Sequence, residues 1–274
     1  MADGVWRIPS LNNAPEFFAL GRLSSTTRNI GRFRVKYVAD DRARVDRLNL
    51  ESMHERALHF LARVLPPSAA APLVDLDLLI MWVGIHEKIG RAGGSAGNRS
   101  FVANYVFGRP ENESVNAART LAILAHEQFH QLVDLVRGEL SPLPIWLNES
   151  LAHYYGLKAL QHAAPSSSAN LVRARFIDPL RPISVGLLEL NRRHATNDST
   201  AYPLFYEQGA TFWSEIDSAM SSTTNGAASL DELVSELLRS EIPESGQLPE
   251  RFVDKLRERI GEKTDALILT YVGN

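Results

Sequence analysis

The run His126-Glu127-Gln128-Phe129-His130 constrains the fold of this chain more than any other feature. Successive residues of a helix are separated by about 100°, so His126, Glu127 and His130 fall on one side of a helix. Two imidazoles at positions i and i+4 can bind one zinc ion, and the glutamate between them is free to act as a base. Catalytic zinc takes three protein ligands and leaves a fourth position for water. We expect Glu149, which follows His130 after eighteen intervening residues, to be the third ligand.

The apolar residues before this run predict that the first ligand helix is buried. A helix that is apolar on all faces lies inside a protein, where unpaired histidine and glutamate side chains cost several kcal/mol. Metal binding would remove that cost; the alternative is a purely structural helix whose histidines are satisfied by hydrogen bonds. We expect Asn112 or Ser114 to cap the start of the helix, and Gly138, followed by Pro142, to mark its end. The apolar residues are Val115, Ala117, Ala118, Leu121, Ala122, Ile123, Leu124 and Ala125.

A second helix is predicted at residues 146–156, entered from a proline turn at 142–144 and ending at or after Gly156. This helix carries Glu149. His153 follows four residues later on the same face, and we expect it beside the ligands or in the core, with zinc ligation as the alternative.

Two further polar residues are expected beside the ligands. Asn148 directly precedes Glu149, and Asp134 lies one turn beyond His130 on the same face. Either could accept a hydrogen bond from a ligand imidazole. For Asp134, the alternative is a solvated aspartate at the end of the helix.

These residues together resemble a known family. His-Glu-x-x-His, eighteen intervening residues and then Glu within Trp-x-Asn-Glu resemble the catalytic domain of M1-type gluzincin metallopeptidases, the aminopeptidase N and leukotriene A4 hydrolase group. The segment Tyr206-Glu207-Gln208-Gly209 is similar to the family's Tyr-Glu-Lys-Gly, with Gln208 in place of the lysine. The resemblance implies that Tyr206 stabilises the oxyanion of the tetrahedral intermediate. The alternative is an aromatic anchor within the apolar stretch 202–213.

A glycine-rich segment matches the family only in part. The family carries Gly-x-Met-Glu-Asn about thirty residues before the zinc helix, on a strand that edges the substrate groove. Here Gly94-Ser95-Ala96-Gly97-Asn98 stands at a similar distance, and the resemblance implies that these residues bind substrate. Gly97 replaces the glutamate that would hold a free amino terminus, so aminopeptidase specificity is not expected to be strict. The alternative is an ordinary glycine-rich loop.

Composition and missing motifs exclude several other classes. A metzincin would need glycine at position 133 and histidine at position 136, and both are valine. The absence of cysteine removes Cys-ligated zinc and thiol nucleophiles, and no Gly-x-Ser-x-Gly or P-loop motif occurs. A net charge of −3 predicts no nucleic-acid partner. Residues 1–9 lack the pattern of a signal peptide and the apolar run 78–84 is too short to span a bilayer, so we expect a cytoplasmic protein without a membrane partner.

Hydrophobic periodicity predicts an α+β fold. Strands are expected at 33–38, 76–83 and 101–107, a helix at 45–64 and a loop at 66–72. From Glu113 the pattern is helical, with breaks at 163–168, 221–227 and 242–249. The resemblance implies a thermolysin-like zincin fold. We expect one compact catalytic unit, with a β-containing lobe at 1–110, a helical lobe at 111–274 and the zinc site between them.

The expected function is that of a zinc metallopeptidase with one Zn²⁺ per chain and a peptide or protein substrate. Glu127 would be the general base and Tyr206 the oxyanion donor. His194 could assist, although its polar surroundings at 191–198 favour a solvated loop. Two alternatives remain: a catalytically weak zinc-binding module for peptides or proteins, and a zinc hydrolase of a small ester, amide or epoxide. A short closed pocket would favour the small substrate, and an open groove near Phe101 would favour peptides.

Overall fold

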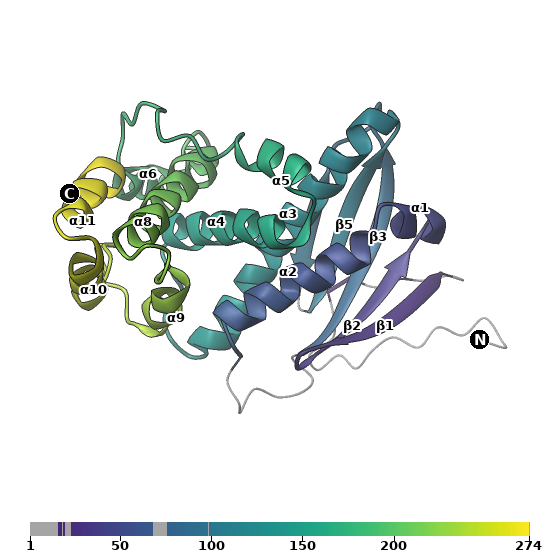
Figure 1. The fold of residues 1–274 in the computed structure, drawn as a ribbon, viewed down its shortest axis with the longest axis horizontal. Coiled ribbons are helices and arrows are strands. Elements are labelled where there is room, and N and C mark those ends of the chain that lie inside the picture. Colours follow the sequence, from purple (N-terminus) through teal and green to yellow (C-terminus); the bar gives the residue numbers. More distant parts are fainter. Residues whose placement is uncertain (1–15, 18, 20–22, 68–75, 98, 274) are drawn as a thin grey trace.

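A mixed five-stranded sheet forms the N-terminal part of the computed structural model, which describes residues 16–17, 19, 23–67, 76–97 and 99–273 (Figure 1). The strand order is β1-β2-β3-β5-β4. The β1–β2 and β4–β5 pairs are antiparallel, and β2–β3 and β3–β5 are parallel. Strand β4 therefore ends the sheet. The strands are β1 Ser24–Ile30, β2 Phe33–Ala39, β3 Asp77–His86, β4 Gly93–Gly97 and β5 Ser100–Phe107.

The three strands expected from the sequence are confirmed as β2, β3 and β5. In β2, residues Phe33, Val35 and Tyr37 are buried while the residues between them are exposed, as period-two alternation predicts. The predicted loop at 66–72 lies largely outside the described residues, as do Asn98 and the N-terminal segment 1–9.

The connection between β2 and β3 contains two helices where the sequence predicted one. Helix α1 spans Arg42–Arg47 and α2 spans Leu50–Val64. The single helix expected at 45–64 is interrupted at Asn49, whose φ of 55° is left-handed. Asparagine tolerates this conformation better than most residues do. Asp41 caps α1 by accepting a hydrogen bond from the Arg44 amide.

The long helix α3, Pro110–Arg137, packs against β5 and β4 on one side and against α4 on the other. It begins before Asn112 and Ser114, so the prediction that either residue caps it is wrong. Pro110 occupies the first turn, where its missing N–H costs no hydrogen bond and its fixed φ suits a helix. The predicted end is confirmed, because Gly138 has a φ of 58° and its amide bonds to the Asp134 carbonyl.

The rest of the chain is helical and forms a lobe on the side of α3 away from the sheet (Figure 1). Its first helix, α4, carries Glu149 and continues through Gly156 to Ala163. The elements are α4 Ile145–Ala163, α5 Ser166–Arg173, α6 Leu187–Ala195, α7 Tyr202–Leu204, the π-helix η2 Phe205–Gly209, α8 Ala210–Thr223, α9 Asp231–Arg239, α10 Glu250–Ile260, α11 Lys263–Leu267 and the π-helix η3 Ile268–Val272.

Two buried tryptophans hold α4 and α8 together. The rings of Trp146 and Trp213 are parallel, with centroids 6.5 Å apart, and the Trp213 indole donates to the Ser150 hydroxyl at 2.8 Å. Such contacts fix the helix that carries Glu149.

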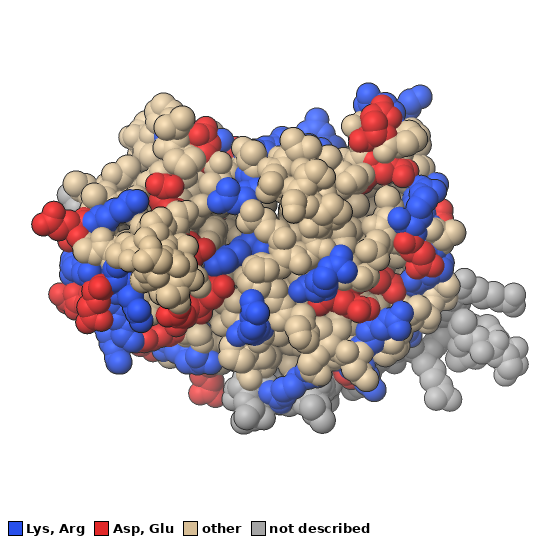
Figure 2. All heavy atoms as spheres, in the orientation of Figure 1, with Lys and Arg blue, Asp and Glu red and all other residues tan. Residues whose placement is uncertain are grey.

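On the outside, basic and acidic side chains are interspersed over the face drawn in Figure 2. Among the described helices, none combines the length and apolar character needed to cross a membrane.

Candidate metal centre

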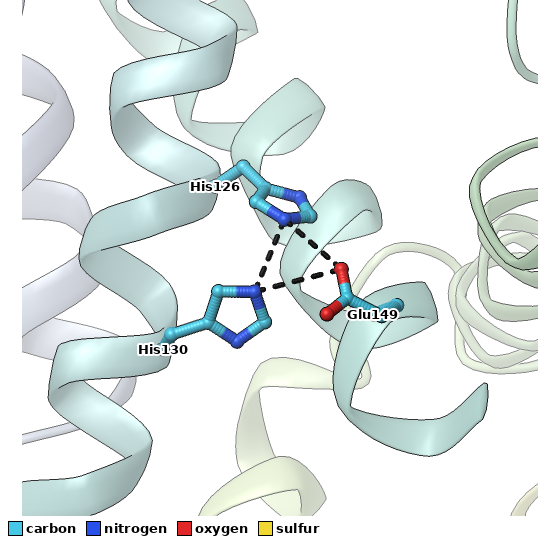
Figure 3. A group of neighbouring side chains, drawn as sticks. All are labelled: His126, His130 and Glu149. Atoms are coloured by element: carbon cyan, nitrogen blue, oxygen red, sulfur yellow. Dashed lines mark hydrogen bonds and ion pairs between the residues drawn. The ribbon is translucent and has the colours of Figure 1, made fainter. Parts of the chain in front are cut away.

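His126, His130 and Glu149 converge on one point between α3 and α4 (Figure 3). The two histidine Nε2 atoms are 3.1 Å apart, and Glu149 Oε2 lies 3.3 Å from Nε2 of His126 and 3.7 Å from Nε2 of His130. Ligand atoms at zinc-bond lengths in a tetrahedral site are separated by roughly 3.4 Å. The three atoms therefore have the chemistry and the spacing to hold one metal ion.

A second contact orients the His130 imidazole. Its Nδ1 lies 3.1 Å from Oδ1 of Asn148, so the Nδ1–H can donate and leave the Nε2 lone pair free. That lone pair then faces the carboxylate of Glu149. Two acceptors face each other in this arrangement, so a proton or a cation must lie between them. Asp134 is exposed and does not take the position beside His130, because Asn148 already occupies it.

Electrostatics at the centre favour a bound cation. Burial alone would raise the pKa of Glu149, but the facing imidazoles of His126 and His130 more than offset it and hold that pKa well below its usual range. Burial lowers the pKa of His130, while the Glu149 and Glu127 carboxylates outweigh burial and raise it. Positive charge is stabilised where the three side chains meet.

Two glycines allow the site elements to approach closely. A Cβ on Gly156 would lie 2.9 Å from the Ala122 carbonyl oxygen and 3.0 Å from the His126 amide nitrogen. A Cβ on Gly209 would lie 2.3 Å from the Ser150 Cβ. The first glycine brings α4 against α3 beside His126, and the second brings η2 against α4 one residue after Glu149. Neither contact follows from local sequence, because both depend on how distant helices cross.

Tyr206 lies over the metal centre from the π-helix η2. Its ring centroid is 5.5 Å from that of His126 and 5.3 Å from that of Tyr202. Burial, the neighbouring Tyr202 hydroxyl and the nearby Glu149 carboxylate raise the pKa of Tyr206 well above its usual value. The phenol therefore stays protonated and can donate a hydrogen bond. Single turns of π-helix occur often at functional sites.

Gln208 is buried and anchors η2. Its side-chain amide donates to the carbonyls of Val185 at 2.9 Å and Tyr271 at 3.0 Å. A buried amide satisfied in this way joins η2 to the C-terminal π-helix η3. The neighbouring Glu207 pairs with Arg181.

Two further histidines, His153 and His194, lie in helices. His153 packs against Phe176 and Tyr206, with ring centroids at 4.3 and 4.9 Å, and burial lowers its pKa to about 3. It lies beside the ligand set but is not part of the converging group. His194 lies in α6 and packs against Tyr202, so the expectation of a solvated loop histidine is wrong. Its apolar neighbours come from residues 202–205, which its local sequence does not reveal.

A cavity of about 760 Å³ extends from the metal centre along α3. His126, Glu127 and Tyr206 line it at the metal end, and Asn112 and Asn116 line it near the start of the helix. The lining positions of α3 recur every three or four residues and so form one face of the helix. Fourteen residues separate Asn112 from His126, which corresponds to roughly 21 Å of helix. Phe101 is buried and does not line this cavity.

The glycine-rich segment lies beside α3 as the edge strand. Gly94 faces the helix, since a Cβ there would lie 3.3 Å from the Ile123 side chain. Ser95 and Ala96 pair with Val102 and Phe101 of β5. A Cβ on Gly97 would lie 2.3 Å from the Cβ of Glu16. The absence of a side chain at Gly97 therefore has a physical reason, because Glu16 occupies that space.

Solved aminopeptidase structures share this fold. An aminopeptidase N family protein from Idiomarina loihiensis matches 93% of the chain with a TM-score of 0.59 and 14% sequence identity. Aminopeptidase A of Legionella pneumophila, solved in complex with aspartic acid, matches 92% with a TM-score of 0.52 and 14% identity. The chain spans 47% of the first protein and 28% of the second. Comparison with protein-family models and with curated protein sequences finds no match. At this identity, the likeness shows a shared α+β fold.

Proposed function

We propose that this chain is a zinc-dependent metallopeptidase. The observation that carries the proposal is the convergence of two histidine Nε2 atoms and one Glu149 oxygen within 3.7 Å of one another, at one end of a long cavity. The aminopeptidase-like fold supports it. A cavity that follows roughly 21 Å of helix suits an extended peptide of about six residues better than a small ester or epoxide.

His126, His130 and Glu149 would hold the zinc ion, which when bound supplies a Lewis acid and lowers the pKa of water toward roughly 7. Glu127 directly follows His126 on α3 and lines the cavity beside it. In the proposed reaction, the Glu127 carboxylate takes a proton from the attacking water and later gives it to the departing amine. The Tyr206 phenol donates a hydrogen bond to the substrate oxygen as negative charge develops on it.

Metal analysis combined with cleavage profiling tests the proposal. The purified protein is expected to hold about one zinc per chain and to cleave members of a mixed peptide library, with products read by mass spectrometry. Glu127→Gln should keep the metal and the fold but lose roughly 10²–10⁴ in rate, the usual contribution of a positioned proton carrier. Undiminished cleavage by this variant, or a zinc-loaded native protein that cleaves no peptide, would contradict the proposal.

A further inference from the structure

The cavity beside the metal centre carries an excess of positive charge. Four arginines and two glutamates line it. Arg109 and Glu87 form an ion pair at 2.8 Å, and Glu127 is the proposed base. The other three arginines, Arg91, Arg119 and Arg175, are exposed and make no ion pair with any residue that the structure describes. This excess contrasts with the chain as a whole, whose net charge is −3.

The three unpaired arginines come from three separate walls of the cavity. Arg91 lies in the connection that leads into β4, Arg119 lies on α3, and Arg175 follows α5. Side chains from three elements that face one cavity can surround a single anionic group. Guanidinium groups suit carboxylates especially well, because their planar donors form two parallel hydrogen bonds.

The position of Arg119 relates this charge to the metal centre. Arg119 precedes His126 by seven residues, which is two turns, so both side chains lie on the same face of α3. Seven residues correspond to roughly 10 Å along the helix. An extended peptide covers the same distance in about three residues. A carboxylate held at Arg119 would therefore lie about three residues from a bond cleaved at the metal centre.

We infer that the cavity selects peptides by a carboxylate about three residues from the scissile bond, held by Arg119 with Arg175 and Arg91. This inference rests on the proposed metallopeptidase function. The carboxylate has two possible sources, an acidic side chain or the free carboxyl end of a short peptide. Because the arginines are exposed, the attraction is screened by salt and is strongest at low ionic strength.

Calorimetric titration of peptides onto zinc-loaded Glu127→Gln, which binds without rapid cleavage, tests the selection. One set of peptides is neutral with an amidated end, a second carries a single aspartate at successive positions, and a third has a free carboxyl end. We expect the best-placed carboxylate to tighten binding roughly tenfold at low salt, and Arg119→Gln or Arg175→Gln to reduce that preference roughly three- to tenfold. The second and third sets show which source is used.

Arg239→Gln is the matched control, because Arg239 is an exposed helical arginine that does not line the cavity. Equal binding of neutral and acidic peptides, or an equal loss in the Arg239 variant, would overturn the inference. Cleavage by the native enzyme separates the two hypotheses. Cleavage without a carboxylate preference leaves the metallopeptidase and removes the selection. Arginine-dependent binding without any cleavage upholds carboxylate binding and removes the metallopeptidase.

Discussion

Asn148 Oδ1 lies 3.1 Å from Nδ1 of His130, so the residue directly before Glu149 orients the His130 imidazole. Asn148→Ala removes the acceptor and frees the imidazole to rotate. We expect zinc affinity to fall roughly 10–100-fold, as measured by competition with a chelator. Asn148→Asp keeps an acceptor at the same place and should retain most of the affinity. Equal losses in both variants would show that the contact does not orient His130.

Tyr206 provides a second test, because its proposed role is confined to the transition state. Tyr206→Phe keeps the ring that packs against His126 and His153. Removal of one oxyanion donor costs roughly 10²–10³ in rate, so kcat should fall with little change in KM or in melting temperature. Tyr202→Phe is the control and should have a smaller effect. A Tyr206 variant that melts early yet turns over normally would identify a core aromatic.

The candidate ligands could be predicted from the sequence because the chemistry depends on local spacing. His126 and His130 are one turn apart on one helix, and α3 forms where its apolar residues indicate. The three buried strands were predictable for the same reason. Strand β1 was not, since its residues Ser24–Ile30 are mostly polar and exposed and lack alternation. The start of α3 was misplaced because the proline at position 110 sets the boundary more strongly than a polar cap.

The surroundings of the ligands could not be read from local patterns. Gly209 and Ser150 are 59 positions apart, and only the packing of η2 on α4 explains why a glycine stands there. Arg175 reaches the cavity from a segment without a motif. The position of Arg119 could be predicted from the sequence, because a residue seven positions before His126 lies on the same face of the helix as His126.

The contact of Gly209 with Ser150 predicts a coupled stability effect. Gly209→Ala would place a Cβ 2.3 Å from the Ser150 Cβ, so the helices must separate. We expect a loss of roughly 1–3 kcal/mol in the free energy of unfolding, measured by denaturant titration. Ser150→Gly removes the opposing atom, and in that background the cost of Gly209→Ala should shrink. If the losses in the free energy of unfolding from the two substitutions simply add, the two positions are not energetically coupled.

Gly97 predicts tolerance of a blocked amino terminus. Gly97 carries no carboxylate, Glu87 is paired with Arg109, and Glu207 is paired with Arg181. N-acetylation of a good substrate should therefore change kcat/KM by less than roughly fivefold, the range of an exposed ion pair. Complete loss on acetylation would mean that another acid binds the amine. Glu16 lies against Gly97, so Glu16→Gln would then test it.

A buried histidine of α2, which packs against α3, predicts how stability depends on pH. His54 is fully buried, and its Nδ1 lies 2.6 Å from the Tyr37 hydroxyl. Burial lowers the pKa of His54 from 6.5 to about 4, so the imidazole is neutral in the folded protein at neutral pH. Between these two pH values the unfolded chain binds the extra proton. The free energy of unfolding should therefore fall as pH drops from about 6.5 to about 4, with His54 contributing roughly 3 kcal/mol.

His54→Asn isolates this contribution, because asparagine can still bond to Tyr37 but does not titrate. The variant should be less stable at neutral pH, yet the difference from the native protein should narrow as pH falls toward 4. Denaturant titrations at matched metal content, at half-unit pH intervals, measure that difference, so contributions shared by both proteins cancel. His59→Asn, on the exposed face of the same helix, should follow the native curve. A constant difference between His54→Asn and the native protein from pH 7 to 4 would show that His54 takes up its proton as readily in the folded state as in the unfolded chain.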